Sequence, residues 1–388
     1  MHEFQLLDDG ETAVLSSYNI IPYDLSVFNI TTGLGWISEG VFQEVNVTSG
    51  ELIFEWHSSL HVTPSESQIT PDSSDTGGDG FSPHTAFDYF HINAIDRTPA
   101  GNYLVSSRHT STIYHINGTT GSIIWRLSYQ GDSDFNCTNF NFSFQHDVRY
   151  QSSNTTTTLI SIFDNASNGP IETRSQSSGK RILLDHDSNT ATRLSETLFP
   201  TPGGLLSTSQ GNTQILPNGG TFHSWGNNPY VTEHAANGTA VLLAQFAAST
   251  AEDYRAFSSL WDSTPATTVP DVYAYAQSLN TNSSSTANST RIYVSWNGAT
   301  SVTSWRFYGG DANADACALT PLGETARTGF ETLFVAQGLY PRVRVEALDV
   351  NGAHLRNSSV TTTFAPGPAL AGACGAEGCA VASTYSSG

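Results

Sequence analysis

The stretch TIYHINGTTGSIIWRL, residues 112–127, has two apolar strand-like runs joined by a turn that begins with Asn and ends with Gly. A similar phrase, FQEVNVTSGELIFEW, stands at 42–56, and weaker copies stand at 229–246 and 342–355. Strand-turn-strand units precede three of these phrases, so each unit holds about four strands. One such sheet cannot bury both of its faces, and radial stacking of several sheets removes their long exposed edges. The repeat therefore predicts an all-β chain folded as a β-propeller.

The predicted propeller covers residues 1–365. A polar insertion at 63–80 is expected to be mobile, the strands within 291–365 complete the propeller or are appended to it, and 366–388 form a low-complexity tail. An array of β-sandwiches is the main alternative, because the units differ in length. No sustained period of 3.6 residues supports a helical solenoid.

The charge balance limits the partners. The formal net charge is −20, and the chain has only 15 Lys and Arg residues, so a nucleic acid would be repelled and would find few phosphate contacts. No run approaches the roughly 20 apolar residues that a membrane-spanning helix needs. We therefore expect neither a nucleic-acid partner nor a membrane span.

Glycosylation sequons are frequent, and they predict a secreted glycoprotein. The residues that follow Met1, HEFQLLDDG, have neither the basic nor the apolar region of a signal peptide, so we expect that signal to be missing from this chain. The cysteines, which allow at most two disulfides of unknown pairing, are Cys137, Cys317, Cys374 and Cys379. The sequon asparagines are Asn29, Asn46, Asn117, Asn136, Asn141, Asn154, Asn165, Asn237, Asn282, Asn288 and Asn357.

Five phrases in order resemble the fungal branch of the arylsulfotransferase-like family. They are DYFHINAID (88–96), GNYLVSSRHTSTIYHINGTTGSIIWRL (101–127), SFQHDVRY (143–150), ISIFDNASNG (160–169) and LPNGGTFHSWGNNPYVTEH (216–234). The resemblance implies six blades and a pocket at one mouth of the channel, lined by His91, His109 and His146. The family usually carries a further segment before the stretch that corresponds to HEFQLLDDGETAVLSSY (2–18), and that segment is missing here, so the first blade would be incomplete or closed by C-terminal strands.

Sulfotransferase members of this family pass a sulfuryl group from a phenol ester to a second phenol through a histidine. That chemistry needs a neutral imidazole as nucleophile and a cation near the sulfuryl oxygens. The resemblance places an arginine just after Phe-Asp-Asn, but Gly169 stands near that position here and Arg174 comes later. Arg108 remains a candidate cation.

A second activity on the same scaffold is that of a hetero-Diels-Alderase, which joins an o-quinone methide from a tropolone or phenol to a polyene terpene. This pericyclic step needs orientation and a few hydrogen bonds rather than a nucleophile. Because the expected arginine is displaced, we favour this activity, in secondary metabolism. The alternatives are a nucleotide-independent arylsulfotransferase that sulfates His146 or His223, and a non-catalytic propeller that only binds a ligand.

The site predictions follow from these phrases and from strand alternation, which places His91 and Asn93 on one face. Asp88 and Asp164 either orient imidazoles or cap turns. Most other histidines are expected to be structural. No metal or cofactor is expected, the partner is an aromatic or terpenoid small molecule, and a homodimer is left open. The predicted catalytic residues are His91, His109, His146 and His223, and the predicted substrate-binding residues are Asn93, Arg108, Asp164, Asn165, Trp225 and Asn227.

Overall fold

The computed structural model of this protein describes residues 2–72, 77–248, 250–279 and 287–365. Strands make up nearly all of its regular structure, so the predicted all-β class is confirmed. The chain divides into two compact units, Met1–Ser258 and Ser259–Gly388. The short 3-10 helices of the described residues are η1 (Asp8–Gly10), η2 (Ser26–Phe28), η3 (Ser58–Leu60), η4 (Pro64–Glu66) and η5 (Pro83–Thr85).

Four antiparallel sheets follow one another along the first unit, each built from consecutive strands as propeller blades are. The first holds β1 (Phe4–Leu7), β2 (Thr12–Tyr23), β3 (Gly35–Asn46) and β4 (Leu52–His57), and the second holds β5 (Ile92–Arg97), β6 (Tyr103–Ser107), β7 (Thr112–Ile116) and β8 (Ile123–Ser128). The third holds β10 (His146–Ser153), β11 (Thr157–Asp164), β12 (Ser178–Asp185) and β13 (Thr190–Leu198), with β9 (Asn136–Thr138) added in parallel at its edge. The fourth holds β14 (Asn212–Ile215), β15 (Thr221–Ser224), β16 (Tyr230–His234) and β17 (Ala240–Gln245).

The repeated turn has the same hydrogen bonds in both strong copies. The side-chain oxygen of Asn46, and likewise that of Asn117, accepts bonds of 2.8 to 3.0 Å from the backbone N–H groups two and three residues further on. Gly50 and Gly121 close these turns with φ of 71° and 73°, a conformation that glycine adopts without steric cost. The phrase therefore recurs because each blade needs the same turn between its last two strands.

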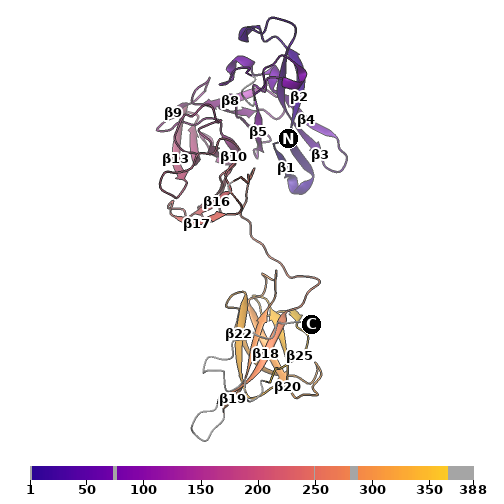
Figure 1. Ribbon diagram of the computed structural model, residues 1–388. Coiled ribbons are helices and arrows are strands. Elements are labelled where there is room, and N and C mark those ends of the chain that lie inside the picture. Colours follow the sequence, from indigo (N-terminus) through magenta and orange to yellow (C-terminus); the bar gives the residue numbers. More distant parts are fainter. Residues whose placement is uncertain (1, 73–76, 249, 280–286, 366–388) are drawn as a thin grey trace. The chain divides into compact units, whose positions relative to one another are not determined.

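Apolar cores lie between neighbouring sheets. Trp56 of the first sheet and Tyr114 of the second share one core, whereas Trp125 of the second and Ile162 of the third share another. Strand β5 lies between β2 and β10, and β10 also contacts β14 (Figure 1). The propeller prediction is confirmed in this blade arrangement, although the described residues form four blades rather than the six that the resemblance implied.

The second unit is a β-sandwich. One sheet contains β18 (Asp271–Leu279), β19 (Ala287–Ser295) and β22 (Glu331–Gln337), and the other contains β20 (Ser304–Gly310), β21 (Thr320–Ala326), β23 (Arg342–Leu348), β24 (His354–Asn357) and β25 (Thr361–Thr362). Both sheets contribute to one core, where the rings of Phe307 and Phe334 stack with centroids 4.4 Å apart. The strands within 291–365 pair inside this sandwich, so of the two alternatives they follow the one in which they are appended to the propeller, and the blades themselves end within the first unit.

The insertion at 63–80 is packed wherever the structure describes it. Ile69 is 3% exposed and belongs to the core of the first two blades, and the backbone N–H of Gln68 donates to the carbonyl of His109 at 2.7 Å. Cys137 and Cys317 are free thiols, so neither supports the predicted disulfides, while Cys374, Cys379 and the tail at 366–388 lie outside the described residues. Across the described ranges, no helix has both the length and the apolar character that crossing a membrane requires.

Candidate functional site

Three of the predicted catalytic histidines gather at one end of the second and third blades. His91 directly precedes β5, His109 follows β6, and His146 is the first residue of β10. Because β5 and β6 are antiparallel, the beginning of one meets the end of the other, and the rings of His91 and His109 lie 4.7 Å apart. We call these three residues and their neighbours the histidine cluster.

His91 is held by Asp88. The backbone N–H of His91 donates to Oδ1 of Asp88 at 3.0 Å, and Nδ1 lies 2.5 Å from Oδ2. His91 has φ of 51°, a left-handed conformation that non-glycine residues rarely adopt away from special sites. Since the carboxylate accepts the proton on Nδ1, Nε2 carries the lone pair. Nε2 has no hydrogen-bond partner among the described residues, and the side chain is 19% exposed.

His109 lies against Arg108. Its ring is fully buried, and Nδ1 lies 2.5 Å from the carbonyl oxygen of Asp88, so Nδ1 is the donor. Nε2 therefore accepts from Nη1 of Arg108 at 2.7 Å. Nη2 of Arg108 donates to the carbonyl of Thr208 at 3.0 Å. The cluster thus contains a fixed guanidinium beside its two closest histidines.

His146 has both ring nitrogens engaged. The side-chain nitrogen of Asn165 donates to the carbonyls of Ser207 and Gln210, which turns its oxygen toward Nδ1 of His146 at 2.7 Å. The backbone N–H of Gln210 approaches Nε2 at 3.3 Å. His146 is 2% exposed, so it is less accessible than His91.

Aromatic residues that the sequence did not reveal connect these histidines. The hydroxyl of Tyr18 lies 3.0 Å from Nδ1 of His2, and the rings of His2 and His91 are 4.7 Å apart. Tyr254 lies 5.7 Å from the ring of His2 and 6.4 Å from that of His146. His2 and Tyr254 stand outside the recurring phrases, and Tyr18 ends the strand-turn-strand unit at 6–18, which indicates a blade but not a site.

Asn93 does not share a face with His91 in the way that strand alternation predicted. A bulge between Ile92 and Ala94 interrupts the pairing of β5 with β6. Asn93 is buried, and its side-chain nitrogen donates to the carbonyl of Gln145 at 2.8 Å. Its side chain therefore joins two blades.

Asp164 caps backbone groups, which is one of the two alternatives left open for it, and it contacts none of the three clustered histidines among its recorded bonds. It is fully buried, its Oδ1 accepts two backbone N–H bonds of 3.0 Å, and its Oδ2 bonds to Nζ of Lys180. Arg174 lies 3.3 Å from Asp164 and 2.6 Å from Glu196. The arginine that follows the Phe-Asp-Asn phrase is thus engaged in an ion-pair network within the third blade.

His223 lies in the interior between the third and fourth blades. It is fully buried, with Nε2 2.8 Å from the hydroxyl of Thr221 and Nδ1 3.3 Å from that of Thr213. A Cβ on Gly179 would lie 2.2 Å from its ring, so this glycine leaves the space that the imidazole fills. These contacts place His223 apart from the histidine cluster, with both ring nitrogens engaged.

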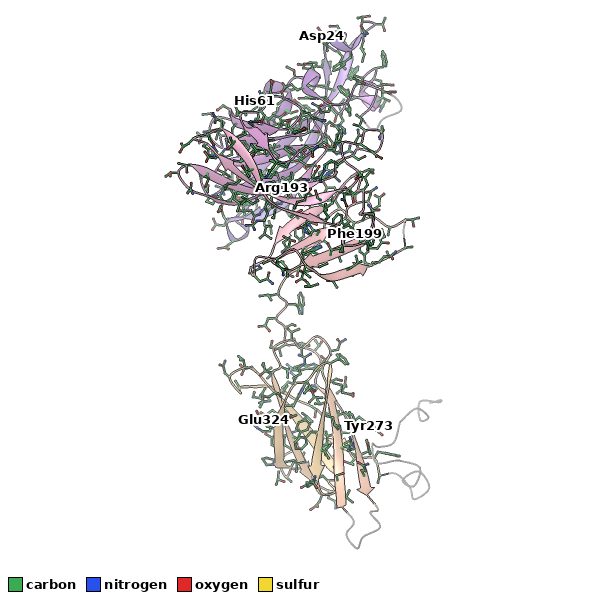
Figure 2. The ribbon with its side chains drawn as sticks, turned by 90° about the vertical axis from the view of Figure 1, so that its left-hand side faces the viewer. Asp24, His61, Arg193, Phe199, Tyr273 and Glu324 are labelled. Carbon is green, nitrogen blue, oxygen red and sulfur yellow. The ribbon has the colours of Figure 1, made fainter. Side chains whose placement is uncertain are left out.

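Trp225 is a core residue, fully buried beside Phe163 and Phe199. Its indole N–H donates to Thr232 at 3.0 Å, and its ring packs edge-on against Phe199, labelled in Figure 2. Asn227 is linked to the cluster through Thr208 rather than by direct contact. It exchanges hydrogen bonds of 3.1 and 3.0 Å with Thr208, whose carbonyl accepts from Arg108.

The electrostatics of the cluster favour neutral imidazoles. Burial, followed by the charge of Arg108, lowers the pKa of His91 and that of His146 well below the usual value. Burial lowers the pKa of His109 to about 3, and it raises the pKa of Asp88. The lone pairs of these rings are therefore present at neutral pH.

Asp88, His91 and His109 offer ligand atoms within 4.8 Å of one another, which is close enough for a metal ion. However, Nε2 of His109 already accepts from Arg108 at 2.7 Å, and its Nδ1 donates to a carbonyl. A dication would lie beside a fixed guanidinium, so the residues fit an anionic group better than a metal.

A pocket of about 350 Å³ opens at the other end of the second and third blades. Thr98 at the far end of β5, His115 and Trp125 line this pocket, and it contains none of the predicted site residues. The predicted histidine-lined mouth is therefore a different place from this pocket.

One of the predicted glycosylation sites is contradicted by the structure. Asn165 is fully buried and both hydrogens of its amide are donated to carbonyls, so it cannot carry a glycan in this fold. The side chains of Asn282 and Asn288 lie outside the description. The other sequon asparagines are exposed or partly exposed: Asn29, Asn46, Asn117, Asn136, Asn141, Asn154, Asn237 and Asn357.

Comparisons with known proteins bear on the first unit above all. Among solved structures, similarity is found to a protein of unknown function from Bacteroides caccae (12% identity, 84% of this chain and 94% of that chain, TM-score 0.32). It is also found to the β-propeller domain of Cps50 (Swd1) from Myceliophteria thermophila (8% identity, 84% of each chain, TM-score 0.29). No curated protein matches the chain. The family model described as Arylsulfotransferase (ASST) matches residues 1–247, which include the whole histidine cluster except Tyr254. The chain therefore belongs to the arylsulfotransferase family.

Proposed function

We propose that this protein is an enzyme that transfers a sulfuryl group between phenols through His91. The observation that supports this most is the pairing of His91 with Asp88, which leaves Nε2 with its lone pair and without a partner in the described residues. His146 and His223, the histidines that the sequence suggested as sulfated residues, have both nitrogens engaged. His91 is therefore the better nucleophile.

The proposed reaction has two displacements. Nε2 of His91 attacks the sulfur of an aryl sulfate, the bond from sulfur to the aryl oxygen breaks, and the phenolate leaves and takes a proton from solvent. The Nδ1–H bond to Asp88 then offsets the charge on the sulfated ring. A second phenol attacks the sulfur and loses its proton to solvent, and the bond from nitrogen to sulfur breaks to restore neutral His91.

Arg108 supplies the cation that this reaction needs. Its guanidinium lies 2.7 Å from His109, whose ring is 4.7 Å from that of His91. A fixed cation there stabilises the charge that develops on the sulfuryl and leaving oxygens. Arg174, which comes late after the Phe-Asp-Asn phrase, is engaged with Asp164 and Glu196, and Arg108 provides the cation beside the cluster instead.

A hetero-Diels-Alderase of secondary metabolism is the second candidate. The neutral imidazoles and the hydroxyls of Tyr18 and Tyr254 favour it, because they suit a flat, uncharged aromatic reactant that needs orientation and hydrogen bonds. For either activity we propose a location in the secretory pathway or outside the cell, supported by the sequons on exposed residues.

An assay with 4-nitrophenyl sulfate as donor and 2-naphthol as acceptor tests the first proposal. We expect transfer that His91→Gln abolishes and that His115→Gln, a change in the separate pocket, leaves intact. Full transfer by His91→Gln would refute the role of His91. If no transfer occurs, the same protein is incubated with an o-quinone methide precursor and a humulene-type polyene. If the adduct ratio is the same with and without the protein, the hetero-Diels-Alderase activity is excluded as well, and a propeller that only binds a ligand remains as the function.

A further inference from the structure

Residues 253–258, which we call the strap, run beside β14 without joining its backbone ladder. Asn212 on β14 holds Ala256 through both ends of its amide, at 2.8 and 2.9 Å. Two residues further on, Gln214 holds Ser258 in the same way, at 2.8 and 2.7 Å. Side-chain amides thus take the place of a neighbouring strand over this segment.

Further contacts place the strap across the histidine cluster. The backbone N–H of Gly211 donates to the carbonyl of Tyr254 at 3.0 Å. The guanidinium of Arg255 binds Glu3 at 2.8 Å and the carbonyl of Asn93 at 2.7 Å. The strap is therefore tied to the inner strands of the second and fourth blades and to the N-terminal segment.

Tyr254 points from the strap into the cluster. Its hydroxyl lies 3.3 Å from the carbonyl of Asn93, and its ring stands between those of His2 and His146. Phe257, by contrast, is 60% exposed. Because side chains rather than a ladder hold the strap, it can open locally at less cost than a strand of a blade.

We propose that the strap is the movable wall of the site and that Tyr254 sets the size of the aromatic substrate. That the ligand is a phenol rests on the function proposed above, whereas the position of the strap as a wall rests on its contacts alone. The strap lies beyond residues 1–247, which the family model matches, so this wall is a feature of the present chain rather than of the matched region.

Modification of histidines by diethyl pyrocarbonate, read by peptide mass spectrometry, tests the wall without any turnover. The reagent acylates accessible neutral imidazoles, and the ring of Tyr254 lies against that of His146, so opening the strap exposes His146. In the double variant Asn212→Ala, Gln214→Ala we expect the rate at His146, which is 2% exposed in the closed form, to rise at least about fivefold. The control is Gln151→Ala, which removes a part-buried amide bonded to Ser161 on the third blade, and it should leave the rate unchanged. An unchanged rate in a folded double variant overturns the wall, and Gln214→Ala alone is measured if the double variant does not fold.

Binding of phenols, followed by ligand-observed NMR, tests the selection by Tyr254. Removing the ring with Tyr254→Ala should favour a three-ring phenol over a one-ring phenol by about tenfold relative to the unchanged protein, which corresponds to about 1.4 kcal/mol. Tyr254→Phe keeps the ring and should keep the original ratio. Equal ratios in Tyr254→Ala and in the unchanged protein would refute the selection. A failed transfer assay with a shifted binding ratio would refute the proposed reaction and leave the wall standing.

Discussion

Asp88→Asn tests the pairing on which the proposed nucleophile depends. The carboxylate of Asp88 accepts two bonds from His91, one from the backbone N–H at 3.0 Å and one from Nδ1 at 2.5 Å. These bonds go to different oxygens, Oδ1 and Oδ2, and an asparagine has an NH₂ group in place of one of them, so it cannot accept both bonds in this geometry. Either the backbone N–H loses its partner, or Nδ1 faces an NH₂ group and Nε2 takes the proton.

The expected loss follows from these bonds. A hydrogen bond to a charged group contributes about 1.5 to 3 kcal/mol, against about 1 kcal/mol for a neutral pair. Both side chains are less than one fifth exposed, at 17% for Asp88 and 19% for His91, so solvent screens this difference little. A loss of about 2 kcal/mol in transition-state stabilisation corresponds to a drop of roughly 30-fold in kcat/KM.

The assay is transfer from 4-nitrophenyl sulfate to 2-naphthol, with kcat and KM measured separately. We expect the loss in kcat, because Asp88 acts on the nucleophile rather than on the substrate. Asp185→Asn, a change in an exposed turn at the end of β12, is the matched control and should retain activity. A folded Asp88→Asn protein with kcat within about threefold of the original would refute this reasoning.

Three further predictions follow from contacts of the first unit. Arg108→Met should lower kcat for transfer by about 100-fold, as loss of one oxyanion contact does, whereas Arg108→Lys should retain part of the activity that Arg108→Met loses. Equal kcat in both variants and in the unchanged protein would exclude Arg108 from the reaction. Burial lowers the pKa of His223 from 6.5 to about 3. Between pH 6.5 and pH 3 the unfolded chain therefore binds more protons than the folded chain, and the free energy of unfolding decreases as the pH is lowered. Urea unfolding should lose about 2 kcal/mol for this residue between pH 7 and pH 5, and His223→Gln should reduce that loss; an identical pH dependence in the variant would contradict it. Lys180→Met leaves buried Asp164 without its closest partner and should destabilise the fold by about 3 to 5 kcal/mol in thermal unfolding, of which a second change, Asp164→Asn, restores part; a variant as stable as the original would contradict this.

The blades could be predicted because their signal is local. Each strong copy of the phrase carries an Asn that binds its own turn and a Gly with positive φ, as at Asn117 and Gly121. The gathering of His91, His109 and His146 followed from the family phrases. The sandwich of the second unit was not predicted, because the weaker copy of the phrase at 342–355 forms an ordinary hairpin turn between β23 and β24, and the strands pair in an order that does not follow the chain.

Two predicted site residues lie away from the histidine cluster, for reasons that a local sequence pattern does not contain. His223 and Asn93 stand in family phrases, but which side of a strand faces the site depends on a bulge at Asn93 and on the space at Gly179. Tyr254 reaches the cluster only because Asn212 and Gln214 hold a segment without strand pattern. These contacts join residues far apart in the sequence, so no local pattern encodes them.

The most direct test of the account is to find the residue that carries the sulfuryl group. The protein is mixed with an aryl sulfate donor without acceptor, quenched in base, digested, and analysed by mass spectrometry with fragmentation of the histidine peptides. Our account predicts a sulfated peptide that contains His91, which disappears when 2-naphthol is added. A sulfuryl group on His146 or His223, or transfer to 2-naphthol without any sulfated histidine, would contradict it.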